Sequence, residues 1–211
     1  MKEEKAKKEK SGSRTLLMSV LMSSPGPLVV GLGLLVGQSS TQLADFVRRS
    51  AELLAIILSY IVYTLTNKQG YTDLEKKASL ERMSNLFVGG AMILGGIAMI
   101  FITLFSENTE KGNVIPGLSI AVMGVIANSL FWRKYTKLGR ETGNQILIVQ
   151  ARLYRAKTFV DGCVTIALTT VAVFPASQAA FYLDFAGSVI VAFYLIYCGI
   201  KTIKEIRKNV K

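Results

Sequence analysis

Long apolar stretches separated by short charged runs divide the chain of 211 residues. An α-helix needs about 20 mostly apolar residues to cross the hydrocarbon core of a bilayer, and six segments meet or approach that length. These segments are residues 15–37, 41–65, 84–105, 114–132, 146–173 and 181–203. The pattern predicts an all-α membrane protein. Its six transmembrane helices occupy residues 14–204, between a charged, solvated and partly disordered tail (1–13) and a short second tail (205–211), with no C-terminal cytoplasmic domain.

The first apolar segment is interrupted by the run Ser23–Pro27, which reads SSPGP. Such a break resembles the end of a secretory signal, but the apolar residues resume at Leu28 and continue to Val36, which is more than a cleaved signal requires. We therefore interpret the segment as one broken membrane helix. A break at membrane depth is tolerated where protein or a water-filled cavity satisfies the freed backbone groups, so it indicates either a cavity or a simple kink.

The cationic residues lie on one side of the expected topology. Nineteen of the 25 Lys and Arg residues fall in residues 1–14, in the stretches 68–82 and 133–140, which we interpret as loops, and in the stretch from 201 onward. In a six-pass topology these four regions share one side, and the opposite connections have Lys111 as their only cation. Cytoplasmic loops are enriched in Lys and Arg, so we expect a cell-membrane protein with both termini in the cytoplasm.

Composition excludes several classes of function. The net charge of +11 is compatible with a nucleic-acid binder, but membrane orientation accounts for most of it, so we expect the lipid bilayer as partner and no nucleic acid. The chain has no histidine, which removes the commonest general base and a common metal ligand. No phosphate-binding glycine loop and no nucleophilic triad occur. We therefore predict no enzymatic activity and no cofactor, and we interpret Cys163 and Cys198 as buried apolar side chains.

Ionisable residues stand inside the second and fifth predicted helices, where they are costly unless they face the bundle interior and find partners. The residues of this polar core are Asp45, Arg48 and Glu52 on the second helix and Gln150, Leu153, Lys157 and Asp161 on the fifth. On each helix the charged members recur at helical intervals and share one face. Two interpretations remain open. The charges line a pathway for a substrate, or they form structural ion pairs such as Glu52–Lys157 and Arg48–Asp161.

Several short motifs resemble the transmembrane domain of the cation diffusion facilitator family, whose members export zinc, cobalt and iron. Leu43–Asp45 (LAD) is similar to the family's opening of the second helix, and Leu80-Glu81 to the pair before the third. Asn144 resembles the start of the fifth helix, and Tyr182–Gly187 (YLDFAG) the start of the sixth. The resemblance runs from about Arg14 to Lys204. It implies a six-helix cation-efflux bundle and a homodimer, which here would form through the membrane helices.

The resemblance also locates the family's metal ligands, which are Asp or His residues four apart on the second and fifth helices. Those positions fall on Arg48 and Glu52, and on Leu153 and Lys157. One carboxylate beside two cations cannot form a four-ligand zinc site, so we expect no metal here. We predict a transporter that moves an ion or small solute through the polar core. Movement of an anion or organic solute by means of Arg48 and Lys157 is a weaker possibility. The alternative is a non-transporting scaffold or regulatory partner.

Overall fold

The computed structural model describes residues 2–36, 40–67, 73–105, 115–173 and 178–208. Every element in these ranges is an α-helix. In chain order the helices are α1 (Lys2–Ser23), α2 (Pro25–Val36), α3 (Ser40–Thr66), α4 (Leu74–Phe105), α5 (Ile115–Thr142), α6 (Gln145–Val173) and α7 (Gln178–Lys208). The first predicted segment corresponds to the end of α1 together with α2, and the other five correspond to α3 to α7. The helical fold class is therefore confirmed.

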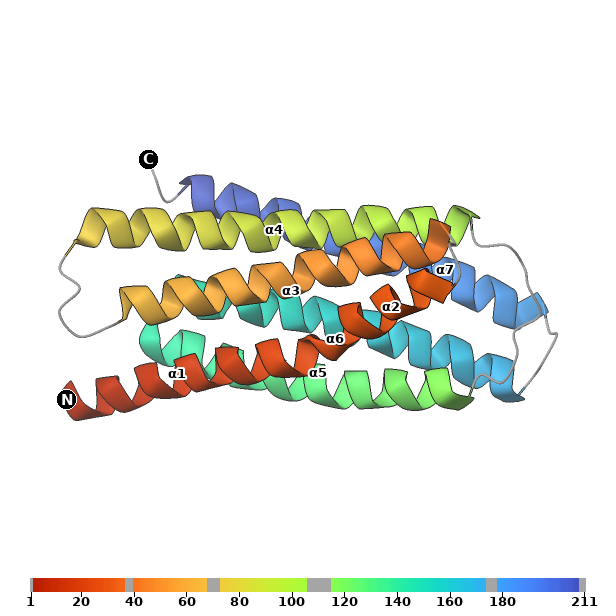
Figure 1. Ribbon diagram of the computed structural model, residues 1–211, viewed down its shortest axis with the longest axis horizontal. Helices are drawn as coiled ribbons and strands as arrows, with labels where there is room; N and C mark the ends of the chain where they lie inside the picture. The colour runs from red at the N-terminus through yellow and green to blue at the C-terminus, as the bar shows by residue number, and fades with distance from the viewer. Residues whose placement is uncertain (1, 37–39, 68–72, 106–114, 174–177, 209–211) are drawn as a thin grey trace.

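The helices form one elongated bundle with both chain ends at the same end of the molecule (Figure 1). Helix α5 packs mainly against α6, and α4 packs against α3 on one side and α7 on the other. The broken pair α1 and α2 lies against α3 and α5. Helices α3 and α6 touch at only a few positions, and polar side chains described below connect them.

Two prolines explain the break between α1 and α2. Proline has no backbone N–H and its ring clashes with the preceding helical turn, so Pro25 and Pro27 cannot continue the hydrogen-bond ladder of α1. Helix α1 accordingly ends at Ser23 and α2 begins at Pro25. The Ser24 hydroxyl donates to the carbonyl oxygen of Leu21 at 2.9 Å, which satisfies one of the freed groups. The predicted broken helix is thus present.

Two charged segments that were expected to lie outside the helices are helical in the structure. Residues 2–13 were expected to form a partly disordered tail, yet they belong to α1, and the presumed loop 133–140 lies entirely within α5. The connection from α5 to α6 is instead a tight turn at Gly143, whose φ of 65° favours glycine. The Asn144 side chain then accepts a hydrogen bond from the Ile146 N–H at 3.0 Å and so caps α6. Charged residues remain good helix formers, so the helices extend beyond their apolar cores.

Glycines bring α4 and α7 into close contact. A Cβ atom on Gly199 would lie 2.6 Å from the Gly89 carbonyl oxygen, and one on Gly96 would lie 2.7 Å from the Ala192 carbonyl oxygen. Gly90 is different, because nothing lies within 4 Å of its Cβ position. Small residues let membrane helices approach through their backbones, and three of these glycines fill that role.

Two of the described helical segments have the length and apolar composition to cross a membrane by themselves, Leu74–Phe105 and Phe185–Arg207. Large apolar side chains on their surfaces remain exposed, among them Phe87, Ile97 and Phe193. Exposed apolar surface of this kind matches the hydrocarbon of a bilayer.

Helix α1 is held to the bundle by buried hydroxyl groups. The Ser19 hydroxyl and the Tyr135 hydroxyl lie 2.7 Å apart, and Tyr135 also donates to the carbonyl oxygen of Thr15 at 3.2 Å. The Tyr135 ring is fully buried and tilts against the ring of Tyr154, with 5.3 Å between ring centroids. Tyr135 on α5 therefore anchors α1 through its hydroxyl group, while its ring packs against α6.

We expect Tyr135→Phe to lower the free energy of unfolding by about 1 kcal/mol, because the hydroxyl contributes hydrogen bonds while the ring packing stays. Ser19 keeps its hydrogen bond to the Leu16 carbonyl oxygen, so no new unsatisfied donor is created. Thermal unfolding in detergent micelles measures the change. Tyr197→Phe is the matched control, since Tyr197 is 60% exposed. Equal effects of the two substitutions would contradict the anchoring role of Tyr135.

Candidate functional site

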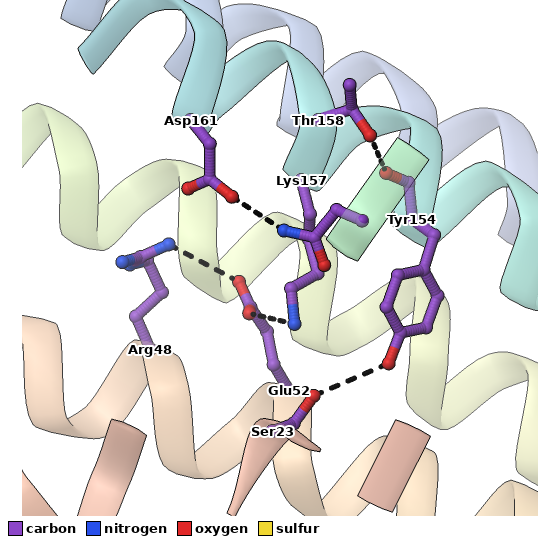
Figure 2. Close-up of polar contacts among 8 residues, drawn as sticks. Ser23, Arg48, Glu52, Tyr154, Lys157, Thr158 and Asp161 are labelled. Atoms are coloured by element: carbon purple, nitrogen blue, oxygen red, sulfur yellow. Dashed lines mark hydrogen bonds and ion pairs between the residues drawn. The ribbon is translucent and has the colours of Figure 1, made fainter. Parts of the chain in front are cut away.

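Glu52 stands at the centre of the polar core between α3 and α6 (Figure 2). One carboxylate oxygen lies 3.5 Å from the Arg48 guanidinium, one turn earlier on α3, and the other lies 3.5 Å from the ammonium group of Lys157 on α6. The three side chains are 7%, 13% and 16% exposed for Glu52, Arg48 and Lys157. Charges with so little exposure need partners, and here one carboxylate serves two cations.

A glycine on α4 makes room for this cluster. A Cβ atom on Gly95 would lie 3.3 Å from Cγ of Arg48 and 3.6 Å from a carboxylate oxygen of Glu52. A larger residue at this position would push against both side chains. The absence of a side chain at Gly95 therefore shapes the charged site.

Lys157 has a second contact on its own helix. Its ammonium group lies 5.1 Å from the centroid of the Tyr154 ring, which is within the range of a cation–π interaction. The Tyr154 hydroxyl is 3.4 Å from the Ser23 hydroxyl at the end of α1, as Figure 2 shows. The cluster is thereby connected to the broken helix.

Asp161 lies one turn beyond Lys157 on α6. Its carboxylate accepts a hydrogen bond of 2.6 Å from the side-chain amide of Asn128 on α5. A Cβ atom on Gly124, one turn before Asn128, would lie 2.5 Å from the same carboxylate oxygen. The α5 surface is therefore shaped to accept Asp161, and an amide satisfies part of its hydrogen-bonding capacity.

Gln150 and Leu153 are both fully buried on α6. The Gln150 amide donates to the Ser59 hydroxyl at 2.9 Å, and the Ser59 and Ser84 hydroxyls are 3.1 Å apart. Leu153 belongs to the apolar core, together with Ile56 of α3, and so contributes packing. Two polar clusters therefore lie along α3 and α6, with apolar residues between them.

The predicted site residues thus fall into groups. Arg48, Glu52 and Lys157 come together, Asp161 is adjacent on α6, and Gln150 lies two turns away. The side chain of Asp45 is outside the described residues. The predicted pair Glu52–Lys157 is confirmed by its geometry, whereas the pair Arg48–Asp161 stays a prediction.

Sequence reasoning missed the partners that come from other helices. Asn128 is an amide within the apolar segment 114–132, and Ser59 and Ser84 are small hydroxyl residues in otherwise apolar helices. An isolated amide in a membrane segment is a signal for an internal polar contact, so Asn128 could have been found. The serines carry no comparable signal, because hydroxyls commonly bond within their own helix, as Ser59 also does with the Ala55 carbonyl oxygen at 2.8 Å.

The donor set at Glu52 does not resemble a metal centre. Across the parts of the chain that the structure describes, no three acidic, cysteine or histidine side chains are grouped so that they could hold an ion. At Glu52 the groups that neutralise the carboxylate are an arginine and a lysine, which cannot ligate a metal in their charged forms. The charged groups of Arg48, Glu52 and Lys157 can instead bind or exchange a proton, an anion or a polar group.

One comparison with known proteins identifies a domain. The family model described as the cation efflux transmembrane domain matches residues 16–209, which is most of the chain. No curated protein matches the chain.

Proposed function

Because the chain belongs to the cation efflux family, we propose that it is an integral membrane transporter whose substrate passes through the polar core between α3 and α6. Proteins of this family are cation transporters. The observation that carries the proposal is the position of Glu52, a nearly buried carboxylate where two helices meet and where Arg48 and Lys157 both contact it. Intramembrane ionisable residues that face a bundle interior mark ion pathways.

The proposed topology has six membrane spans and places both termini in the cytoplasm of a cell-membrane protein. Its support is the sidedness of the Lys and Arg residues, together with the location of both chain ends at one end of the bundle (Figure 1). A homodimer formed through the membrane helices is part of the same proposal.

We propose further that ordinary divalent-metal export is lost. The support is electrostatic: the four positions that resemble the family's ligands are Arg48, Glu52, Leu153 and Lys157, and the two cations already neutralise the single carboxylate. Zinc binding to the purified protein tighter than about 1 μM would contradict this part of the proposal.

The second candidate function is a scaffold in which these charges are structural. The contact of 3.5 Å between Glu52 and Lys157 favours it, because buried ion pairs can fix helix register without taking part in transport. The two functions differ in what a neutral residue at position 52 does.

The test is flux in proteoliposomes, with protons, zinc and small anions each tried as substrate. We expect Glu52→Gln to abolish the flux of whichever substrate the unaltered protein carries, because the amide keeps the shape but not the charge. Glu75→Gln is the control, since Glu75 is an exposed residue in the first turn of α4. Unchanged flux in Glu52→Gln, with lowered thermal stability alone, would favour the scaffold.

A further inference from the structure

A polar cavity opens at the end of the bundle that holds both chain termini. Its volume is about 380 Å³, and its walls come from α1, α3, α4 and the turn between α5 and α6. Tyr63, Glu81 and Asn144 are among the lining residues. The polar contacts across this cavity are long, for example 3.4 Å from the Asn144 amide to the Glu81 carboxylate. The cavity is large enough for several water molecules, and its walls offer them donors and acceptors.

A set of buried polar side chains lies deeper in the bundle, next to this cavity along the helices. We name Ser59, Ser84 and Gln150 the polar layer. On α3 and α4 the layer is about one helical turn from the cavity wall, since Ser59 is four residues from Tyr63 and Ser84 is three from Glu81. The hydrogen bonds from Gln150 to Ser59 and from Ser59 to Ser84 join its members. Cavity and polar layer therefore follow one another along α3 and α4, and from the turn at Asn144 into α6.

Some buried polar atoms in the polar layer and elsewhere in the bundle have hydrogen-bonding capacity that the described residues do not use. The side-chain oxygen of Gln150 has no partner among the described residues, and neither has that of Asn85, the residue after Ser84. Both side chains are buried, with exposed fractions of 0% and 3%. The hydroxyl of Thr202 on α7, also fully buried, is a third such group. Buried polar atoms are nearly always satisfied, and ordered water is the usual partner where protein supplies none.

We propose that the polar layer binds ordered water that enters through the cavity. Seven residues separate Ser59 from Glu52 on α3, and seven separate Gln150 from Lys157 on α6, so the water ends about two turns from the ion pair. The fully buried side chains of Ile56 and Leu153 occupy the intervening space. The proposal deepens the proposed function, because it assigns the end of the bundle from which a substrate reaches the core. This meaning for transport rests on the proposed function.

Thiol accessibility tests the proposal. Ser59→Cys and Ser84→Cys are introduced singly into the full chain carrying Cys163→Ala and Cys198→Ala, reconstituted in nanodiscs, and treated with methanethiosulfonate ethylammonium. Only a thiol that reaches water forms the reactive thiolate, so we expect both to react at least about tenfold faster than Ile61→Cys. Ile61 is on the same helix as Ser59 and is an exposed apolar residue. Asn67→Cys, on the cavity wall, is the positive control.

Two further substitutions, each combined with a cysteine variant, test where the water enters and where it binds. Thr142→Trp places a large ring on the cavity wall and is expected to slow labelling of Ser59→Cys. Gln150→Leu removes the unpartnered oxygen and is expected to slow Ser59→Cys while leaving Asn67→Cys unchanged. The proposal is overturned if either serine position reacts as slowly as Ile61→Cys, or if neither second-site substitution slows the reaction.

These labelling rates do not depend on flux. A protein that labels at Ser59→Cys but carries no substrate would keep the hydrated layer and refute only the proposed function. A protein that transports but does not label would refute the hydrated layer alone.

Discussion

Glu52→Leu is expected to lower the free energy of unfolding by about 3–5 kcal/mol, the largest effect of any substitution considered. The change removes the carboxylate that both Arg48 and Lys157 contact, and it leaves two poorly exposed cations near each other. The desolvation of an unpaired charge costs far more than the lost packing of one side chain. Reversible unfolding in mixed micelles measures the difference.

The double variant Glu52→Leu with Lys157→Leu separates the charge effect from packing. We expect it to recover part of the loss, because one of the two cations that faced the lost carboxylate is replaced by an apolar side chain, which needs no charged partner. Glu75→Leu is the control for removal of an exposed carboxylate, and it should change stability by no more than about 0.5 kcal/mol. Lys157→Leu is also measured alone. If the stability losses of Glu52→Leu and Lys157→Leu simply add in the double variant, Glu52 and Lys157 are not coupled.

The second large effect is expected at the contact between α4 and α7. Gly199→Ala would place a methyl group 2.6 Å from the Gly89 carbonyl oxygen and 2.7 Å from Cγ1 of Ile93. A backbone oxygen cannot rotate away as a flexible side chain can, so the helices must separate. We expect a loss of about 1–3 kcal/mol in the free energy of unfolding, the range found for overpacked sites.

Gly90→Ala is the matched control for this prediction. It lies on α4 next to Gly89, but nothing is within 4 Å of its Cβ position. Alanine is the better helix former by up to about 1 kcal/mol, so this variant should be as stable as the unaltered protein or more stable. A loss at position 90 equal to that at position 199 would show that helix flexibility, not the close approach, explains the effect.

The helical segments could be predicted from the sequence because a membrane span requires a long apolar run. The ends of the helices could not be predicted in this way. Apolar runs mark where lipid begins, whereas a helix ends where its hydrogen-bond ladder is broken, as at Pro25 or Gly143. Lys, Arg and Glu continue a helix as readily as apolar residues do, and the charged residues 133–140 are therefore helical.

The polar core was predictable within each helix but only partly between helices. Helical spacing places Arg48 and Glu52 on one face of α3, and an unpaired lysine on a facing helix is the natural partner, so the Glu52–Lys157 pair follows from charge and depth. The Asn128–Asp161 hydrogen bond depends on how α5 rotates against α6. The polar layer at Ser59 depends on the register of three helices. A local sequence pattern predicts neither the rotation of one helix against another nor the register between helices.

The few contacts between α3 and α6 have a thermodynamic consequence. The two helices meet through polar bridges such as Glu52–Lys157 and Gln150–Ser59 and through the buried side chains of Ile56 and Leu153. The rest of their apolar surfaces is mainly covered by other helices. Heat-capacity changes follow the apolar area that becomes exposed to water. Separation of α3 from α6 would expose little apolar area beyond that of Ile56 and Leu153. The free-energy difference between a closed and an opened core would therefore have a small heat-capacity change and would depend almost linearly on temperature.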